Sequence, residues 1–285
     1  MTLQDELIAW FDAEARDLPW RRDTSPWSVL VSEFMLQQTP VSRVLPVFEA
    51  WMRRWPTPAA LASDPPGEAV RAWGRLGYPR RALRLHAAAT AIVDRHDGEV
   101  PPERDALLAL PGVGDYTASA VTSFAFGARH PVLDTNVRRV FARVVQGVAF
   151  PAPSVTAGER ARAESLMPEH DASRWAAATM ELGALVCTSR ALRCSDCPVA
   201  DRCRWRAAGY PEHAGPPRRG QAWAGTDRQV RGRLMAVLRA ADGPVSRTAL
   251  DATWDDAVQR VRCLDTLVLD GLVEPVGDDL FALPA

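Results

Sequence analysis

Residues 187–203 read CTSRALRCSDCPVADRC and hold four of the five cysteines of the chain. Their spacing is Cys187-x6-Cys194-x2-Cys197-x5-Cys203, and no histidine follows Cys187 before His213. Structural zinc sites usually combine two Cys-x-x-Cys pairs or add histidine, whereas four thiolates also suit a [4Fe–4S] cluster. We therefore predict a [4Fe–4S] cluster on these four cysteines, with zinc as the next interpretation and a pair of disulfides as the last.

The N-terminal residues MTLQDELIAWFDAEARDLPWRR are amphipathic and charged, unlike a signal peptide. No apolar run approaches the roughly 20 residues that cross a bilayer. We expect a cytoplasmic, nucleoid-associated protein with no membrane contact. A reducing compartment favours metal-bound thiolates over disulfides, and the chain length allows about two domains.

The chain contains no lysine, because all 34 of its basic residues are arginine. A side-chain amine is required for Schiff-base catalysis by a protein side chain. The sequence therefore excludes that chemistry.

The net charge of −1 hides two regions of opposite sign. Residues 187–239 hold eleven arginines against four acidic residues, and residues 240–285 hold three arginines against nine. A cationic patch of this kind is what phosphate binding requires. The acidic region predicts packing or partner binding rather than DNA contact.

Helical periodicity dominates up to about residue 210. After a first helix around Leu7 and a second from Ser25 to Met35, we expect helices at 40–54, 66–75, 79–96, 103–110, 115–126, 135–145, 158–167 and 171–186. Two of them are joined by Leu110-Pro-Gly-Val-Gly114. Gly112 and Gly114 permit a tight turn whose exposed amides can hold a phosphate.

Residues 211–226 are rich in proline and glycine and predict a linker. Beyond it, helical patterns at 228–240, 246–250 and 255–269 precede two short strands at 272–275 and 280–283. This order is typical of a winged helix.

Two carboxylates stand in places suited to catalysis. Glu33 lies in a mostly apolar helix end, where desolvation raises a carboxyl pKa and favours general-acid work. Asp134 lies directly before a helix, where aspartate is also a favoured N-cap. Alone, each has an ordinary structural interpretation.

Seven motifs together resemble the MutY-type adenine DNA glycosylases, which belong to the helix-hairpin-helix, iron–sulfur base-excision family. They are Leu-Pro-Trp-Arg (18–21), Ser-Glu-Phe-Met-Leu-Gln-Gln-Thr (32–39), Leu-Gly-Tyr (76–78), Leu-Pro-Gly-Val-Gly (110–114), Leu-Asp-Thr-Asn-Val (133–137), Met-Glu-Leu-Gly (180–183) and the cysteine loop. The resemblance spans about residues 3–210.

The resemblance implies a mainly α fold of two helical lobes. A six-helix barrel would span 22–130, and residues 1–21 and 131–210 would form the iron–sulfur lobe. The linker 211–226 and a small winged-helix-like α/β tail at 227–285 would follow. The implied substrate is double-stranded DNA with adenine mispaired with 8-oxoguanine or guanine, and we expect a monomer.

The resemblance also assigns roles within the active site. The adenine is flipped out of the duplex, Glu33 protonates its N7, and Asp134 stabilises or traps the oxocarbenium-like sugar. By the same matching, the base pocket is lined by Arg16, Trp20, Arg21, Leu36 and Glu181. Tyr116 and Asn136 support the cleft. The residues expected to wedge into the base stack are Gln38, Thr39, Leu76 and Tyr78.

Two departures qualify this assignment. The family's Asp-Gly-Asn is Asp-Thr-Asn here, and its usual Nudix-like C-terminal domain, which reads 8-oxoguanine, is replaced by the short tail. We therefore expect a weaker preference for 8-oxoguanine over guanine, with little influence of the acidic tail.

Three other classes of protein share some of these motifs. Endonuclease III-like enzymes use a lysine just after the hairpin, where this chain has Tyr116. A thymine or uracil mismatch glycosylase also accommodates Tyr116 and is the main alternative. A non-catalytic iron–sulfur DNA-binding regulator would leave Glu33 and Asp134 without a role.

Overall fold

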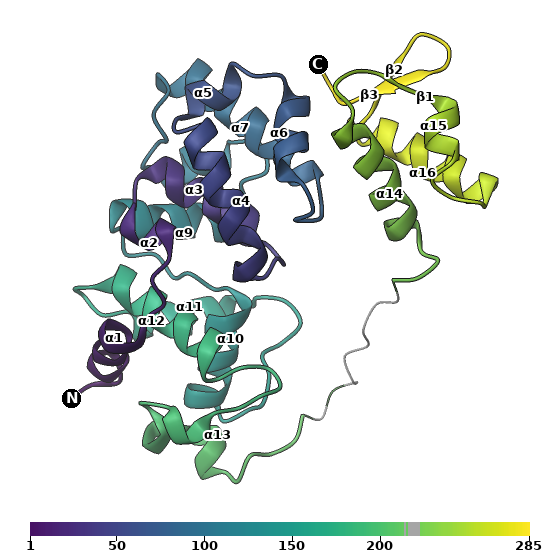
Figure 1. The fold of residues 1–285 in the computed structure, drawn as a ribbon. Helices are drawn as coiled ribbons and strands as arrows, with labels where there is room; N and C mark the ends of the chain where they lie inside the picture. Colours follow the sequence, from purple (N-terminus) through teal and green to yellow (C-terminus); the bar gives the residue numbers. More distant parts are fainter. Residues whose placement is uncertain (214, 216–222) are drawn as a thin grey trace. The chain divides into compact units, whose positions relative to one another are not determined.

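The structure is a computed structural model that describes residues 1–213, 215 and 223–285. The predicted linker therefore falls in part on residues outside the described ones. Helices make up most of the described chain (Figure 1). They are α1 Leu3–Glu14, α2 Pro19–Arg22, α3 Pro26–Leu36, α4 Val41–Arg54, α5 Pro58–Ala62, α6 Pro66–Trp73, α7 Arg80–His96, α8 Arg104–Leu108, α9 Asp115–Phe126, α10 Thr135–Phe141, α11 Ala157–Leu166, α12 Ala172–Leu185, α13 Arg204–Ala207, α14 Asp227–Ala240, α15 Arg247–Asp251 and α16 Ala257–Leu269.

Local chemistry explains where several helices begin and end. Thr2 and Asp5 form a reciprocal capping box at the start of α1. Asp134 caps α10, and Gly127 ends α9 in the left-handed region at φ 69°. The long predicted helices are confirmed. The short helices α2, α5 and α13 were missed.

The chain divides into two compact units. The first comprises Met1–Val29, Pro102–Leu108 and Gly114–Pro217, and the second comprises Leu30–Pro101, Ala109–Val113 and Arg218–Ala285. Residues 102–108 and 114–130 thus group with the cysteine-bearing residues, whereas the resemblance implied that they belong with the barrel.

The core of the first unit lies between α1, α10 and α12. Leu7, Phe141, Trp175 and Leu182 are buried there, and the rings of Phe141 and Trp175 stack with 6.1 Å between centroids. Burial of these large apolar side chains provides the main stabilisation of the unit.

The core of the second unit is built around three tryptophans. Trp51 of α4 meets Trp55 and Trp73 edge to face, with ring centroids 4.5 and 5.6 Å apart. All three side chains are fully buried. Their contacts hold α4 against α6.

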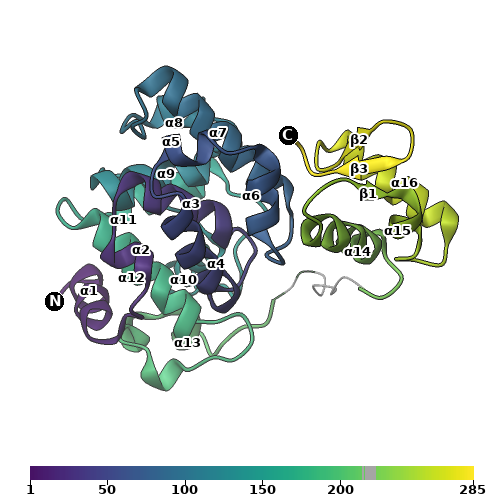
Figure 2. The same cartoon turned by 45° about the horizontal axis from the view of Figure 1, so that its top comes forward.

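The tail contains helices α14 to α16 and a three-stranded antiparallel sheet in the order β1-β3-β2 (Figure 2). The strands are β1 Val245–Ser246, β2 Glu274–Val276 and β3 Leu280–Ala282. The predicted helices and strand pair are confirmed in order. Strand β1 was missed, since two residues give no alternation, and the strand expected at 272 begins at Glu274 because Leu272 and Val273 are buried outside the sheet.

The predicted mainly α fold with a small α/β tail is confirmed by this arrangement. Among the described residues, no helix is both long and apolar enough to cross a membrane.

Candidate active site

Asp134 is held at the N-terminus of α10. One carboxylate oxygen accepts a hydrogen bond from the Val137 backbone N–H at 2.6 Å, and the other accepts from Asn136 Nδ2 at 2.8 Å. The predicted N-cap is therefore present. Burial raises the pKa of Asp134, and the two hydrogen bonds and the charge of Arg139 offset this only in part. The effect of desolvation on this pKa is thus larger than that of the hydrogen bonds at the helix N-terminus.

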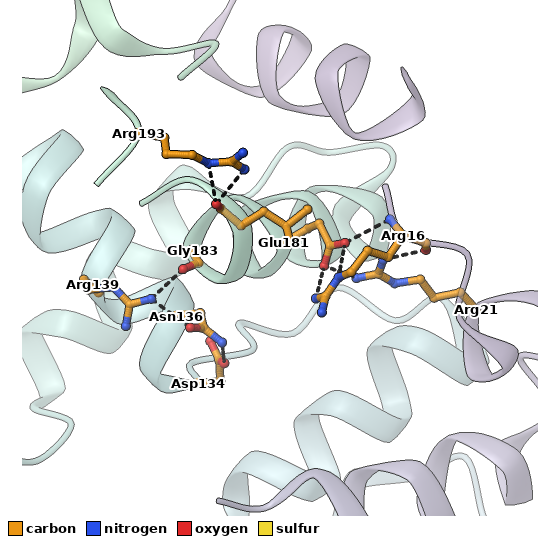
Figure 3. A network of polar contacts seen from close by, with 9 residues as sticks. Arg16, Arg21, Asp134, Asn136, Arg139, Glu181, Gly183 and Arg193 are labelled. Carbon is orange, nitrogen blue, oxygen red and sulfur yellow. Dashed lines mark hydrogen bonds and ion pairs between the residues drawn. The ribbon is translucent and has the colours of Figure 1, made fainter. Parts of the chain in front are cut away.

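Asn136 is itself fixed by Arg139, a residue that sequence reasoning missed (Figure 3). Arg139 donates to Asn136 Oδ1 at 2.8 Å, to the Gly183 carbonyl at 2.6 Å and to the Cys187 carbonyl at 2.7 Å. These bonds connect the Asp134 turn with the start of the cysteine loop. No local signal was available, because on a helix Arg138 and Arg139 lie on the side opposite Val137 and Val140, where exposure to solvent is expected.

Gly183 permits the close approach of α12 to α10. A Cβ at this position would lie 2.7 Å from the Asn136 Cβ and 2.8 Å from its carbonyl oxygen. The glycine of the Met-Glu-Leu-Gly motif is therefore required by packing.

Glu181, also on α12, is fully buried and saturated with cationic donors (Figure 3). The Nε–H and one terminal N–H of the Arg16 guanidinium donate to the carboxylate at 2.8 and 2.6 Å. The backbone N–H of Arg16 also donates to it, at 3.0 Å. Arg21 adds a bond of 2.8 Å. Burial raises the pKa of Glu181, but these bonds outweigh it and bring the pKa to about 2. Both oxygens are thus occupied by arginines.

Three of the predicted base-pocket residues are therefore brought together: Arg16, Arg21 and Glu181. Trp20, beside them on α2, is half-buried. Leu36 belongs to α3 and is also half-buried.

Glu33 lies in the part of α3 that belongs to the second unit, which begins at Leu30. It is only 6% exposed, and its neighbours Ser32, Phe34 and Met35 are buried with it. The burial expected at this helix end is therefore present.

The two glycines of the hairpin between α8 and α9 differ in how much space surrounds them. Gly112 has φ 78°, and a Cβ there would lie 2.7 Å from the Arg84 Cβ and 3.1 Å from Phe34 Cε1. Around Gly114, by contrast, a Cβ would meet no described atom within 4 Å. Gly112 is needed for the turn, while Gly114 leaves the N-terminus of α9 open to a ligand. Tyr116 follows on α9 and is half-buried.

The four predicted wedge residues differ in exposure. Gln38 and Tyr78 are exposed and have φ of 53° and 48°, in the left-handed region. Thr39 and Leu76 are buried, and Thr39 Oγ1 donates to the Leu76 carbonyl at 3.4 Å. Of these four, Gln38 and Tyr78 are the accessible ones in this conformation.

Arg81, which sequence reasoning also missed, joins the two wedge segments. Its buried guanidinium donates to the Phe34 carbonyl at 2.9 Å, to Thr39 Oγ1 at 3.0 Å and to the Gly77 carbonyl at 3.0 Å. Because it serves acceptors from both segments, it fixes their separation. Its only sequence signal was its place one turn after Leu-Gly-Tyr.

The four cysteines of the loop line one small cavity. Val144, Val186 and Trp205 share that cavity, and Arg143 donates to Cys187 Sγ at 3.3 Å. All four are free thiols, so the disulfide interpretation is wrong for the described residues. Burial raises the pKa of Cys197 to about 11, and its three neighbours add to the effect.

The spacing of these thiols bears on which metal group they fit. Among the described residues, no three His, Cys, Asp or Glu side chains converge closely enough to hold one metal ion. Four thiolates on zinc all lie about 2.3 Å from a single ion. In a [4Fe–4S] cluster each thiolate binds its own iron, so the ligands stand further apart. All four donors are cysteine thiols that line one cavity, which is the ligand type that a [4Fe–4S] cluster takes.

Comparison with known proteins identifies the chain. Residues 31–161 match the HhH-GPD superfamily of base excision DNA repair proteins. An adenine DNA glycosylase of Mycobacterium tuberculosis is 55% identical over 282 residues, which cover 98% of this chain and 92% of that protein. This chain belongs to the adenine DNA glycosylase family. A match over 98% of this chain must include the tail at 227–285. The Mycobacterium tuberculosis protein therefore has a segment that corresponds to the tail.

One further adenine DNA glycosylase and two solved structures match a smaller part of the chain. The human adenine DNA glycosylase is 41% identical over 210 residues, which cover 70% of this chain and 38% of that protein. A thermostable thymine-DNA glycosylase has a similar structure, with TM-score 0.65 and 25% identity over 72% of this chain and 95% of that one. A trapped covalent endonuclease III–DNA complex gives TM-score 0.62 and 25% identity, over 73% and 95%. The predicted fold and the predicted class, a glycosylase of base-excision repair, are confirmed.

Proposed function

We propose that this protein hydrolyses the N-glycosidic bond of adenine in duplex DNA where adenine is mispaired with 8-oxoguanine or guanine. The observation that carries the proposal is the Asp134 turn, in which a half-buried carboxylate is oriented by Val137 N–H and Asn136. Among the described residues, no cation donates a hydrogen bond directly to this carboxylate. Such a group can face developing positive charge on a sugar.

Two carboxylates divide the chemistry. Glu33 gives its proton to N7 of the extrahelical adenine, so that the bond between C1′ and N9 breaks and neutral adenine leaves. The ionised Asp134 stabilises the oxocarbenium-like sugar. Water then attacks C1′ and gives its proton to Glu33, which restores the starting state.

The base pocket is proposed to consist of Arg16, Trp20, Arg21 and Leu36, with Glu181 acting beneath them. Since both Glu181 oxygens already accept from arginines, we assign this residue to orienting Arg16 and Arg21 rather than to binding adenine. Tyr116 and Asn136 support the cleft.

DNA contact is proposed at the open N-terminus of α9 beside Gly114 and at the arginines of the cysteine loop. Backbone amides and guanidinium groups both bind phosphates without reading sequence. Gln38 and Tyr78 are proposed to enter the base stack.

The reaction is proposed to stop at base removal. Because the chain has no lysine, a side-chain Schiff base with the sugar cannot form. Product strands should remain intact until alkali is added, and efficient borohydride trapping of protein on DNA would contradict this.

We also propose that Cys187, Cys194, Cys197 and Cys203 hold a [4Fe–4S] cluster. When bound, the cluster would fix the loop that presents Arg190–Arg206. Cys197→Ser should lower both stability and DNA affinity with loss of iron and sulfide, whereas Cys263→Ser, in the tail, should keep both elements. Stoichiometric zinc without iron would overturn the assignment.

A thymine mismatch glycosylase is the second candidate, since a thymine-DNA glycosylase of Aeropyrum pernix is 36% identical over 207 residues. Single-turnover assays on duplexes with adenine, thymine or uracil opposite 8-oxoguanine or guanine distinguish the two. We expect excision of adenine alone, and faster release of thymine or uracil would reject the proposal.

A further inference from the structure

Tyr78 occupies a conformation that needs support. Its φ of 48° lies in the left-handed region, which is energetically unfavourable for a residue other than glycine. The residue is 50% exposed to solvent. Gly77 before it also has positive φ, at 87°. A ring on such a turn would sample several orientations unless neighbouring groups fixed it.

Two guanidinium groups face the Tyr78 ring. Arg81, from the start of α7, lies 5.5 Å from the ring centroid. Arg228, from the first turn of α14 in the tail, lies 5.7 Å from it and also donates to the Tyr78 hydroxyl at 3.2 Å. Cation–π contacts within about 6 Å and a directed hydrogen bond together restrict ring rotation.

The tail packs against other residues of the second unit and makes several hydrogen bonds with them, in addition to the contact with Tyr78. Arg71 of α6 donates to the carbonyls of Arg239 and Ala241, and Arg239 Nε donates to the Val70 carbonyl at 3.1 Å. At the other end of α6, Gly67 N–H donates to the Pro284 carbonyl at 2.8 Å. Beside Tyr78, Arg80 pairs with Asp270 of the tail at 3.2 Å.

These contacts explain part of the acidic composition of the tail. Asp270 accepts from Arg80 of the helical region and from Arg231 of α14. An acidic side chain that faces arginines of the same unit serves docking, so the tail's net charge need not oppose its placement near DNA. This removes the argument from charge that led us to expect little influence of the tail.

We propose that Arg228 is a positioning residue for Tyr78, and that through it the docked tail sets the preference of the enzyme for the base opposite adenine. The inference rests on the proposed function, in which Tyr78 enters the base stack beside that base. A fixed ring can distinguish 8-oxoguanine from guanine by shape and stacking, whereas a freely rotating ring adapts to both.

The test uses the full-length protein and single-turnover excision of adenine opposite 8-oxoguanine and opposite guanine. Arg228→Ala should reduce the ratio of the two rate constants by roughly three- to tenfold, the size expected for one cation–π contact and one hydrogen bond. Arg233→Ala is the matched control, because Arg233 lies on the same helix and contacts Trp254 and Thr253, which both belong to the tail. It should leave the ratio unchanged.

Two further variants separate positioning from general damage. In a Tyr78→Leu background, Arg228→Ala should have no further effect on the ratio, because residues that act as a unit are not additive. Gly67→Ala should reproduce the effect of Arg228→Ala from a distance, since its Cβ would lie 2.4 Å from the Pro284 carbonyl oxygen and displace the tail.

An unchanged ratio in Arg228→Ala would overturn the inference. So would a loss from Arg228→Ala that is equally large in the parent and in the Tyr78→Leu background. Failure of the unaltered protein to remove adenine from either mispair would instead reject the proposed function. The two kinds of failure are therefore distinguishable.

Discussion

Two carboxylates in the first unit, Asp134 and Glu181, have pKa values that are shifted in opposite directions. Glu181 is completely buried and receives four hydrogen bonds from Arg16 and Arg21, so its pKa falls to about 2. Asp134 is held by backbone N–H groups and the side-chain amide of Asn136, and its pKa rises because burial outweighs those neutral donors. Burial alone therefore does not decide the state of an acid; the charge of its donors does.

The difference agrees with the proposed roles, in which Glu181 is a structural carboxylate and Asp134 is the reactive one. An acid whose lone pairs are all taken by guanidinium groups has none left for a substrate, and it orders whatever its partners touch. An acid oriented by neutral donors has no ion-pair partner among those donors, so that its charge, when it is ionised, can face a substrate. Four changes test this comparison, from the largest expected effect to the smallest.

The largest effect is expected for Glu33→Gln, which removes the proposed proton donor. Excision should fall by at least about 10²–10⁴-fold, because protonation of the leaving base is lost. Duplex affinity, measured by fluorescence anisotropy, should stay within twofold to threefold. Glu49→Gln, at an exposed position of α4, is the control and should behave like the parent. Excision by Glu33→Gln within tenfold of the parent would remove Glu33 from this role.

Glu181→Gln should cost stability in a manner that depends on pH. The pKa of this carboxyl falls from 4.5 to about 2 on folding, so its contribution is complete above pH 4.5 and is lost as pH falls toward 2. The free energy of unfolding at pH 7 should drop by about 3 kcal/mol. Urea titrations from pH 7 to pH 3 should show the difference between parent and variant shrinking with acidity. A constant difference would mean that charge pairing is not the cause.

Gly183→Ala tests the point where the two carboxylate regions meet. The added Cβ would lie 2.7 Å from the Asn136 Cβ, so α12 and α10 must move apart. We expect a loss of about 1–3 kcal/mol in unfolding free energy. Excision should fall as well, because Asn136 orients Asp134. Gly158→Ala, on α11 with no described atom within 4 Å of the added Cβ, is the control. Full activity of Gly183→Ala would show that the Asn136 position is not critical.

The smallest effect on stability is expected at Asp134 itself. Asn is as good an N-cap as Asp, so Asp134→Asn should change the free energy of unfolding little, whereas Asp134→Ala should cost about 1 kcal/mol. Because the pKa of Asp134 is raised on folding, its ionisation disfavours the folded state. Asp134→Asn should therefore gain in stability relative to the parent as pH rises above 4, opposite in sign to Glu181→Gln. Thermal unfolding across pH 4 to 7 checks this order.

Much of this arrangement could be predicted from local sequence. The long helices, the Gly112 turn and the Asp134 cap depend on neighbouring residues, and the resemblance supplied the family. Local sequence could not pair Glu181 with Arg16 and Arg21, which lie 165 and 160 positions away; only the resemblance placed the three in one pocket, and it did not predict their ion pairs. Arg81 and Arg228 were missed for the same reason: their value lies in acceptors and a ring brought close only by the fold. Strand β1 was missed because it has two residues.

The most direct test of the account compares Asp134→Asn with Glu181→Gln in one assay. Both variants are mixed in saturating excess with a duplex that contains adenine opposite 8-oxoguanine, and the single-turnover rate constant is measured at neutral pH and low temperature, where both remain folded. The account predicts that Asp134→Asn loses excision by at least about 10²-fold, while Glu181→Gln retains a rate constant within about tenfold of the parent. Excision retained by Asp134→Asn and abolished in folded Glu181→Gln would reverse the assignment of the reactive and structural carboxylates.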